Sequence, residues 1–273
     1  MATNVVANLV FEVDLDQDGS MERHEHLLRI GEPVKFGRSL NSNLITCPGY
    51  NISRNHLEFF SVEPDPESTA ASLVYVRDRQ SVNGTFVNGL QIGKGSTEIT
   101  PAYLLQDGDI VEVKSNVRIL VQQPAMRASL HELTNIQKKE VKMFEGQYIV
   151  TNRVLGEGGF ARVHLAIDAR TKQQVVCKIH DISKSWGGWN GIAARQALRE
   201  VDIWCQLDHP NIVSFKRAYR TPHTLYTFAE LATGGDFFSM IYQMKRFQEI
   251  EVRWVMRQLL HGLSYLNSKA TDF

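Results

Sequence analysis

The chain has 273 residues, which is enough for two domains of ordinary size. Its 30 basic and 30 acidic side chains give a net charge of zero, and a content of 43% hydrophobic and 22% charged residues excludes a disordered or fibrous protein. No apolar run approaches the length of a transmembrane helix, and the first residues lack a secretory signal. We therefore expect a protein of the nucleus or cytoplasm that is neither secreted nor embedded in a membrane.

The net charge conceals two halves of opposite sign. Residues 1–124 carry 10 basic and 16 acidic side chains, whereas residues 125–273 carry 20 and 14. Cys47, Cys177 and Cys205 are far apart in the sequence, which argues against a disulfide scaffold or a zinc knuckle and favours a reducing compartment. The charge asymmetry predicts two units.

The first half has the pattern of an all-β domain. Its short runs of β-branched and aromatic residues are separated by turn sequences such as Asn83-Gly84 and Asp107-Gly108. We expect strands at residues 8–13, 27–30, 57–60, 73–77, 85–87 and 110–113. Short strands at this spacing are typical of a β-sandwich or a barrel.

Three polar clusters fall in the predicted turns of this half. They are Phe36-Gly-Arg-Ser39, Ser53-Arg-Asn-His56 and Ser81-Val-Asn-Gly-Thr-Phe-Val-Asn-Gly89. Together they offer guanidinium groups, hydroxyls and an amide on loops of a β scaffold, where binding residues usually lie. Arginine presents a planar fork to phosphate oxygens and serine adds a short hydrogen bond, so the clusters predict a phosphate-binding site.

In their order and spacing, the three clusters resemble those of the forkhead-associated (FHA) domain, a β-sandwich that binds phosphothreonine peptides. The resemblance covers residues 7–121. The residues that it assigns to the phosphothreonine peptide are Arg38, Ser53, Arg54 and Asn83. The first two would hold the phosphate, the third would add a contact, and the asparagine would bind the peptide backbone. His56 would buttress the loop, and Val82 departs from the Ser or Thr of many members.

The residues also leave simpler interpretations open. Each cluster taken alone is explained by turn chemistry, and only the three in order favour a ligand site. The acidic run from Asp14 to Glu25 fits the spacing of a calcium-binding loop, but its β-branched upstream flank favours an acidic turn between two strands. His24 and His26 look like a metal pair, whereas strand alternation favours a solvated edge.

The second half begins after a polar stretch, residues 122–146, in which we expect a linker with a short helix. Strand-like runs follow at residues 148–155, 163–167 and 174–179, and helical patterns come later, at residues 193–207 and 249–267. Strands that precede helices predict an α+β unit.

A glycine-rich segment opens this second half. The run Gly156-Glu-Gly-Gly-Phe-Ala-Arg-Val163 lies between two strand-like segments, which favours a hairpin that covers nucleotide phosphates. Lys178 on an apolar strand needs a partner if it is buried, and Glu200 on a predicted helix supplies a carboxylate. Residues 227–236 look like a strand that runs into a hinge.

This ordered series resembles the small lobe, the hinge and the first large-lobe helices of a Ser/Thr protein kinase. We therefore assign residues 147–273 to a partial kinase domain, an incomplete α+β fold that follows the all-β FHA sandwich. The resemblance implies ATP, with Mg²⁺, as the cofactor. The residues that it assigns to ATP are Leu155, Gly156, Gly158, Val163, Lys178, Glu200, Glu230, Ala232 and Asp236.

The resemblance also assigns roles within this set. Lys178 would contact the α- and β-phosphates and would be oriented by an ion pair with Glu200. Glu230 and Ala232 would offer backbone groups to the adenine, and Asp236 would reach the ribose.

A kinase of this family would continue beyond residue 270 into a catalytic loop and a metal-binding triplet. We expect this chain to lack the catalytic base, through an error in the gene structure or as a truncated isoform, and to be inactive as it stands. An FHA domain before a kinase resembles the checkpoint kinases of the DNA-damage response. The implied partners are a phosphothreonine-containing protein and ATP, with no direct nucleic acid and no membrane. The alternative is a non-catalytic phosphothreonine adaptor with a degenerate half-kinase.

Overall fold

The computed structural model describes most of the chain in two compact units. The described residues are 4–14, 22–47, 51–63, 72–95, 100–113, 117–123, 130–158, 161–184, 187–244 and 246–269. Within these limits the first unit comprises residues 1–127 and 233–243, and the second comprises residues 128–232 and 244–273. None of the helices in the described ranges is both long and apolar enough to cross a membrane.

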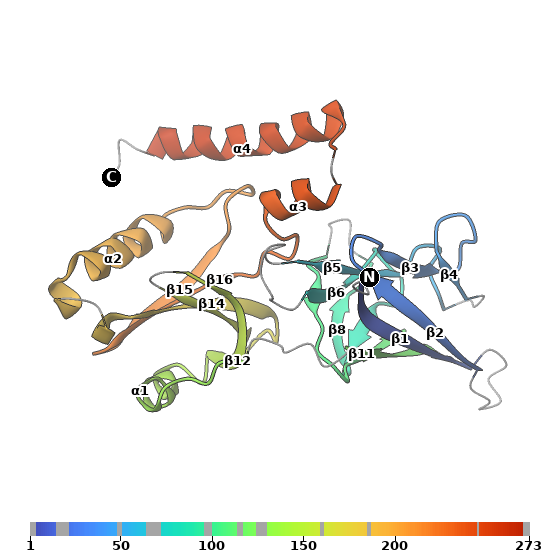
Figure 1. Ribbon diagram of the computed structural model, residues 1–273, viewed down its shortest axis with the longest axis horizontal. Helices are drawn as coiled ribbons and strands as arrows, with labels where there is room; N and C mark the ends of the chain where they lie inside the picture. The colour runs from blue at the N-terminus through green and yellow to red at the C-terminus, as the bar shows by residue number, and fades with distance from the viewer. Residues whose placement is uncertain are drawn as a thin grey trace. The chain divides into compact units, whose positions relative to one another are not determined.

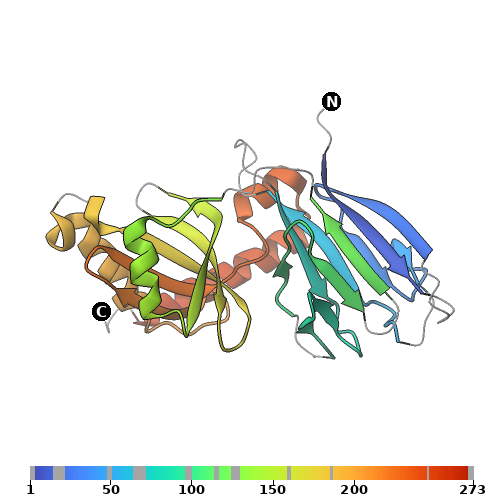
Figure 2. The same cartoon turned by 90° about the horizontal axis from the view of Figure 1, so that it is seen from below.

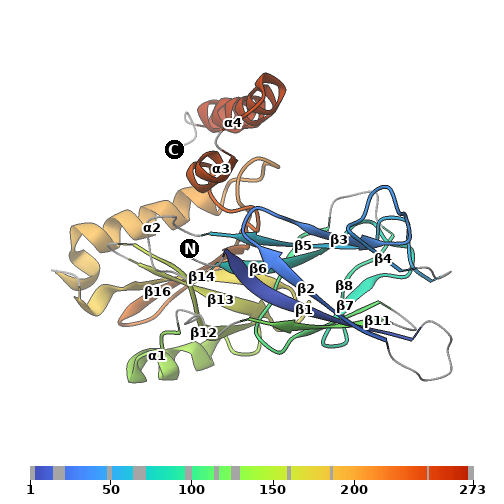
Figure 3. The same cartoon turned by 45° about the vertical axis from the view of Figure 1, so that its right-hand side comes forward.

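The first unit is a β-sandwich (Figure 1, Figure 3). One sheet has the strand order β2-β1-β11-β10-β7-β8, and the other has the order β4-β3-β5-β6-β9. The strands are β1 (Val5–Val13), β2 (Glu22–Arg29), β3 (Val34–Gly37), β4 (Ile45–Thr46), β5 (Leu57–Val62), β6 (Leu73–Asp78), β7 (Thr85–Val87), β8 (Leu90–Gly93), β9 (Tyr103–Leu104), β10 (Ile110–Val113) and β11 (Val117–Gln122). The expected all-β sandwich is confirmed, and each predicted strand overlaps an observed one.

Alternation along the strands builds the core between the two sheets. From β1, the side chains of Ala7, Leu9, Phe11 and Val13 enter the core and are at most 7% exposed. Phe11 stacks on Phe36 of β3 with the ring centroids 5.8 Å apart, which joins the two sheets. This period of two is the pattern that a strand with one face on a core requires.

The second unit is built on a five-stranded antiparallel sheet with the order β12-β13-β14-β16-β15. The strands are β12 (Tyr148–Glu157), β13 (Arg162–Asp168), β14 (Gln174–Asp181), β15 (Phe215–Arg220) and β16 (Thr224–Glu230). The α-helices in the described ranges are α1 (Asn135–Glu140), α2 (Ile192–Trp204), α3 (Phe237–Met244) and α4 (Glu249–Lys269), of which α3 falls almost wholly in the first unit. The expected α+β fold is confirmed.

The two faces of this sheet have different partners. Helices α1 and α2 lie on opposite faces (Figure 1), and Figure 2 shows α1 against the sheet from below. Along β14, Val175, Cys177 and Ile179 are buried in the core on the α1 side. Lys178 points to the other face, because its ammonium group contacts Glu200 of α2.

Part of the predicted linker packs on the sheet. Thr134 caps α1 through a capping box, in which Gln137 N–H donates to Thr134 Oγ1 at 3.2 Å and Thr134 N–H donates to Gln137 Oε1 at 3.0 Å. Phe144 follows and is only 1% exposed, with its ring stacked on Tyr219 at 4.7 Å between centroids. The expected short helix is therefore present, and the segment from residue 130 covers the α1 face of the sheet.

Candidate functional site

Three loops of the first unit are joined by hydrogen bonds. Arg38, after β3, donates its backbone N–H to the carbonyl of Ser53 at 2.9 Å. Ser53 lies between β4 and β5, and its Oγ accepts the backbone N–H of Val82 at 2.9 Å. In the same β6–β7 loop, the side-chain amide of Asn83 donates to the carbonyl of Asn51 at 2.9 Å. The structure thus brings together the loops that carry Arg38, Ser53 and Asn83.

The groups on these loops suit an anion. Arg38 and Arg54 are exposed, and neither forms an ion pair with another residue in the part of the chain that the structure describes. Ser53 Oγ accepts one hydrogen bond and keeps its own proton for donation to an acceptor such as phosphate. The side chain of Val82 is 71% exposed, so this residue serves the loop through its backbone N–H.

His56 is fully buried beneath the loops. Its Nδ1 accepts the backbone N–H of Ser53 at 3.0 Å, and its Nε2 lies 3.2 Å from the carbonyl oxygen of Gly84. Because Nδ1 is an acceptor, the proton is on Nε2, which donates to Gly84. Burial lowers the pKa of His56 and keeps the ring neutral. This geometry is that of a buttress between two loops.

We expect the first unit to lose stability as the pH falls below about 6.5, the ordinary pKa of histidine. Since the pKa of His56 is lowered in the folded state, the unfolded chain binds the proton more readily, and acid favours unfolding. Thermal melting followed by circular dichroism between pH 8 and pH 5 measures the loss. In His56→Gln the melting temperature should depend less steeply on pH. An equally steep dependence would assign the loss to other groups, such as His26, whose pKa is also lowered.

A buried carboxylate that the sequence analysis missed supports the β6–β7 loop. Asp78 is 2% exposed and accepts the backbone N–H of Ser81 at 2.8 Å, its hydroxyl at 2.6 Å and the hydroxyl of Thr85 at 2.6 Å. Ser81 Oγ in turn accepts the backbone N–H of Gly84 at 3.0 Å. An aspartate three residues before Ser-Val-Asn-Gly is a turn signal that identifies this role.

A second supporting residue, Asn43, fixes the loop after β3. Its side-chain amide donates to the carbonyls of Ser39 at 2.8 Å and of Arg54 at 2.6 Å. Gly37 allows the close approach of the two loops, because a Cβ at this position would collide with the carbonyl oxygen of Arg54. Both residues shape the site without offering a charged group to a ligand.

In the second unit, strand register places several of the predicted nucleotide residues in one row. Gly156 pairs with Val163, Val163 pairs with Lys178, and Lys178 pairs with Thr227. Directly opposite residues in neighbouring strands project to the same face of a sheet. Val163 and Lys178 therefore share the face on which α2 lies.

The glycine-rich segment closes as a hairpin. Gly158 N–H donates to the carbonyl of Ala161 at 2.9 Å, and Leu155 is half-buried at the end of β12. Residues 159–160, at the centre of the segment, lie outside the described residues. A hairpin whose exposed backbone contains glycines is suited to cover phosphate groups.

Lys178 and Glu200 form the ion pair expected from the sequence. The ammonium group lies 2.7 Å from Glu200 Oε1 and 3.0 Å from Oε2, and the side chains are 31% and 45% exposed. At this exposure the pair contributes little to stability. Its effect is to hold the ammonium group at a fixed place beside the row of β-strand residues.

Glu230, in the predicted hinge, is held by two hydrogen bonds to Ser214. Glu230 donates its backbone N–H to the carbonyl of Ser214 at 2.9 Å, and its carboxylate accepts Ser214 N–H at 3.1 Å. Asp236 instead caps α3, accepting the N–H and hydroxyl of Ser239 at 2.7 and 2.9 Å. These bonds lower the pKa of Asp236. Asp236 belongs to the first unit, and its role at a ribose, like that of Ala232 at an adenine, stays a prediction.

No group of three or more His, Cys, Asp or Glu side chains in the described ranges is arranged to hold a metal ion. Most of the calcium-loop pattern, residues 15–21, lies outside those ranges. Strands β1 and β2 flank it on either side, which is the arrangement of the acidic turn.

Comparison with known proteins matches both halves of the chain. The FHA domain family matches residues 34–114, and the protein kinase domain family matches residues 149–271. The meiosis-specific serine/threonine-protein kinase mek1 of Schizosaccharomyces pombe is 33% identical over 240 residues, which cover 87% of this chain and 48% of that protein. The serine/threonine-protein kinase cds1 of the same organism is 25% identical over 241 residues, 86% of this chain and 50% of that protein.

The chain thus spans about half the length of these two curated relatives. Among solved structures, the MEK1 FHA domain in complex with a phosphothreonine peptide of HOP1 matches with a TM-score of 0.33 and 25% identity. This match covers 42% of the chain and 95% of that domain.

Proposed function

The chain belongs to the Ser/Thr protein kinases that carry an FHA domain, and we propose that its first unit binds phosphothreonine on a partner protein while its second unit binds ATP. The first part of the proposal rests on the joined loops, which carry two exposed arginines, Arg38 and Arg54, and the Ser53 hydroxyl. A dianionic phosphate is the ligand that such a set of charged donors binds best.

Calorimetric titration tests the phosphothreonine site. The probe is a pool of peptides with a fixed phosphothreonine, and the control is the same pool with unmodified threonine. We expect saturable binding of the phosphorylated pool only. Equal binding of both pools, or binding of neither, would contradict the proposal.

The residues of the second unit fit a nucleotide. Lys178, held by Glu200, places a cation where the α- and β-phosphates would lie, and the hairpin that begins at Gly156 would cover them. Since the backbone N–H of Glu230 already donates to Ser214, its carbonyl is the group that would accept a hydrogen bond from adenine. The N–H of Ala232 would serve the same ring.

The small side chain of Ala229 predicts a nucleotide pocket with free space behind the adenine ring. It directly precedes Glu230, is 1% exposed, and offers only a methyl group. We expect ATP analogues with a bulky apolar group on the purine to bind the natural chain about tenfold more tightly than Ala229→Met, because overpacking costs about 1–3 kcal/mol. Competition with a fluorescent nucleotide measures this, and unsubstituted ATP is the control. Equal affinities for the bulky analogue would refute the idea.

We propose further that the two activities are coupled in checkpoint or cell-cycle signalling, with the phosphothreonine site docking the kinase on its partner. The alternative is an adaptor that binds phosphothreonine and nucleotide without transferring phosphate. Incubation of the purified chain with Mg-ATP separates the two. Phosphate incorporation would exclude the adaptor, and nucleotide binding without incorporation would exclude catalysis by this chain.

A further inference from the structure

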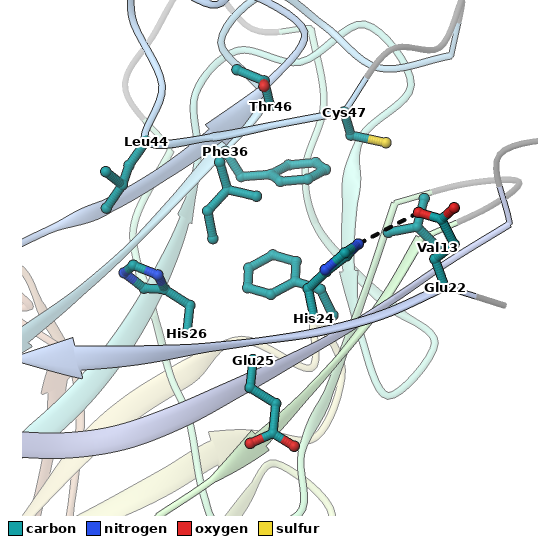
Figure 4. Close-up of a pocket in the computed structure, with 11 residues that line it drawn as sticks. Val13, Glu22, His24, Glu25, His26, Phe36, Leu44, Thr46 and Cys47 are labelled. Carbon is teal, nitrogen blue, oxygen red and sulfur yellow. Dashed lines mark hydrogen bonds and ion pairs between the residues drawn. The ribbon is translucent and has the colours of Figure 1, made fainter.

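Each unit contains a cavity, and the two cavities differ in what surrounds them. In the first unit a cavity of about 370 Å³ opens between β2 and β4, with His24 and His26 among the residues that line it (Figure 4). In the second unit a cavity of about 210 Å³ lies between the glycine-rich hairpin and residues 131–137. These residues belong to the segment that joins the two units, so the chain that arrives from the first unit lies beside the hairpin.

The second cavity lies on the far side of the hairpin from the predicted nucleotide residues. His164, which lines the cavity, pairs with Cys177 of β14, and Cys177 is buried on the α1 side of the sheet. Val163 and Lys178 occupy the alternate positions of the same two strands and project to the other face. A contact in this cavity therefore acts on the back of the hairpin and leaves the nucleotide face free.

The joining segment is attached to the outer edge of β12, the end strand of its sheet. Leu130 forms an antiparallel bridge with Arg153, and the backbone N–H of His131 donates to the carbonyl of Asn152 at 2.8 Å. We call Leu130 and His131 the clasp. Through this bridge the clasp holds the strand that continues into the glycine-rich hairpin.

The clasp meets β12 where the strand is irregular. The register of β12 against β13 shifts between Val150 and Val154, and it shifts again between Val154 and Gly156. A β-bulge bends its strand and changes the direction of the residues beyond it. The hydrogen bond of the clasp is made at Asn152, inside the first irregularity. It therefore bears on the direction in which β12 runs into the hairpin.

His164 supports the same irregularity from the side of β13. Its ring is 1% exposed, and its Nδ1 lies 2.8 Å from the carbonyl oxygen of Thr151, so this nitrogen carries the proton and donates it. The Thr151 hydroxyl donates to the carbonyl of Leu165 at 2.8 Å. The ring of His164 also lies edge-on to that of His131, with the centroids 6.4 Å apart. The bulge is thus held by β13 on one side and by the clasp on the other.

We propose that Leu130 and His131 are positioning residues for nucleotide binding, because their bridge to the bulge of β12 fixes the direction of the glycine-rich hairpin. The inference rests on the proposed nucleotide site, and it makes the affinity for ATP depend on the segment that arrives from the first unit. Since the hairpin would cover the phosphates, the clasp affects ligands that carry phosphates and not a bare nucleoside. Loss of its one hydrogen bond weakens ATP binding by about fivefold.

A proline at residue 131 tests the clasp, because proline has no backbone N–H to donate to Asn152. The matched control is Glu132→Pro, which places the same residue one position later and keeps the N–H of His131. The ion pair that this control removes, between Glu132 and Lys138, is exposed and contributes little. Competition against a fluorescent nucleotide on the complete chain measures the affinities for ATP and for adenosine.

His131→Pro should bind ATP about fivefold more weakly than the natural chain and adenosine with unchanged affinity, whereas Glu132→Pro should bind both normally. In His131→Pro, amide hydrogen exchange should become faster in residues 154–158 and stay unchanged in β14. Unchanged ATP affinity or unchanged exchange in residues 154–158 of His131→Pro would overturn the proposal. A similar loss for adenosine, or an equal loss in Glu132→Pro, would also overturn it. If the natural chain binds no ATP, the proposed nucleotide site fails, and this inference fails with it.

Discussion

Arg38→Ala should reduce the affinity for phosphothreonine peptides to below detection, at least about thirtyfold. The side chain is exposed and extends from a loop whose backbone is fixed by Ser53 and Asn43. Loss of one partner of a charge-assisted pair in a binding site costs about 2–5 kcal/mol, and every 1.4 kcal/mol is a factor of ten. Isothermal titration with the phosphorylated peptide pool measures the change.

The same substitution should leave the fold intact. Exposed side chains outside ion pairs usually contribute less than about 0.5 kcal/mol to the free energy of unfolding, so the melting temperature should stay near that of the natural chain. Arg29→Ala, at the end of β2, removes an exposed arginine from the same unit and should bind normally. Arg38→Lys keeps the charge without the planar fork and should give an intermediate affinity. Unchanged affinity of Arg38→Ala would place the phosphate elsewhere.

The sandwich and the positions of the three polar clusters in its loops were predictable because their signals are local. Strand alternation and Asn-Gly turns mark β7 and its neighbours, and a loop between two strands has few conformations open to it. The residues that support the loops were harder to predict. Asn43 acts through a hydrogen bond to Arg54 on another loop, and Asp78 acts through the hydroxyl of Ser81 in the turn that follows it. Neither residue is part of a periodic hydrophobic pattern.

The cover of the second sheet could not be predicted from the sequence. Phe144 is one aromatic residue in a stretch that includes Lys138, Lys139, Glu140 and Lys142, so the segment has the composition of a solvated linker. Only the tertiary structure shows that Glu140 Oε2 accepts the hydroxyl of Tyr226 at 3.1 Å and that the phenylalanine is buried.

Phe144→Ala should destabilise the second unit by about 3–5 kcal/mol, the usual cost of truncating a fully buried phenylalanine. The ring contacts three aromatic side chains of the sheet, with centroids 4.7 Å from Tyr219, 5.1 Å from Tyr226 and 5.3 Å from Phe228. Such pairs add to the effect of burial alone. All four tryptophans of the chain lie in residues 125–273, so tryptophan fluorescence during urea unfolding reports this unit selectively.

Met143→Ala is the matched control, because its side chain is the immediate neighbour and is 57% exposed; it should change the free energy of unfolding by less than about 0.5 kcal/mol. Phosphothreonine binding should be normal in both variants, since Arg38, Ser53 and Asn83 lie in the first unit and the substituted residues lie in the second. Equal urea midpoints for the two variants would mean that residues 130–146 are dispensable to the sheet. A large difference would mean that the second unit begins near residue 130, and that a fragment begun at residue 147 would expose an aromatic face.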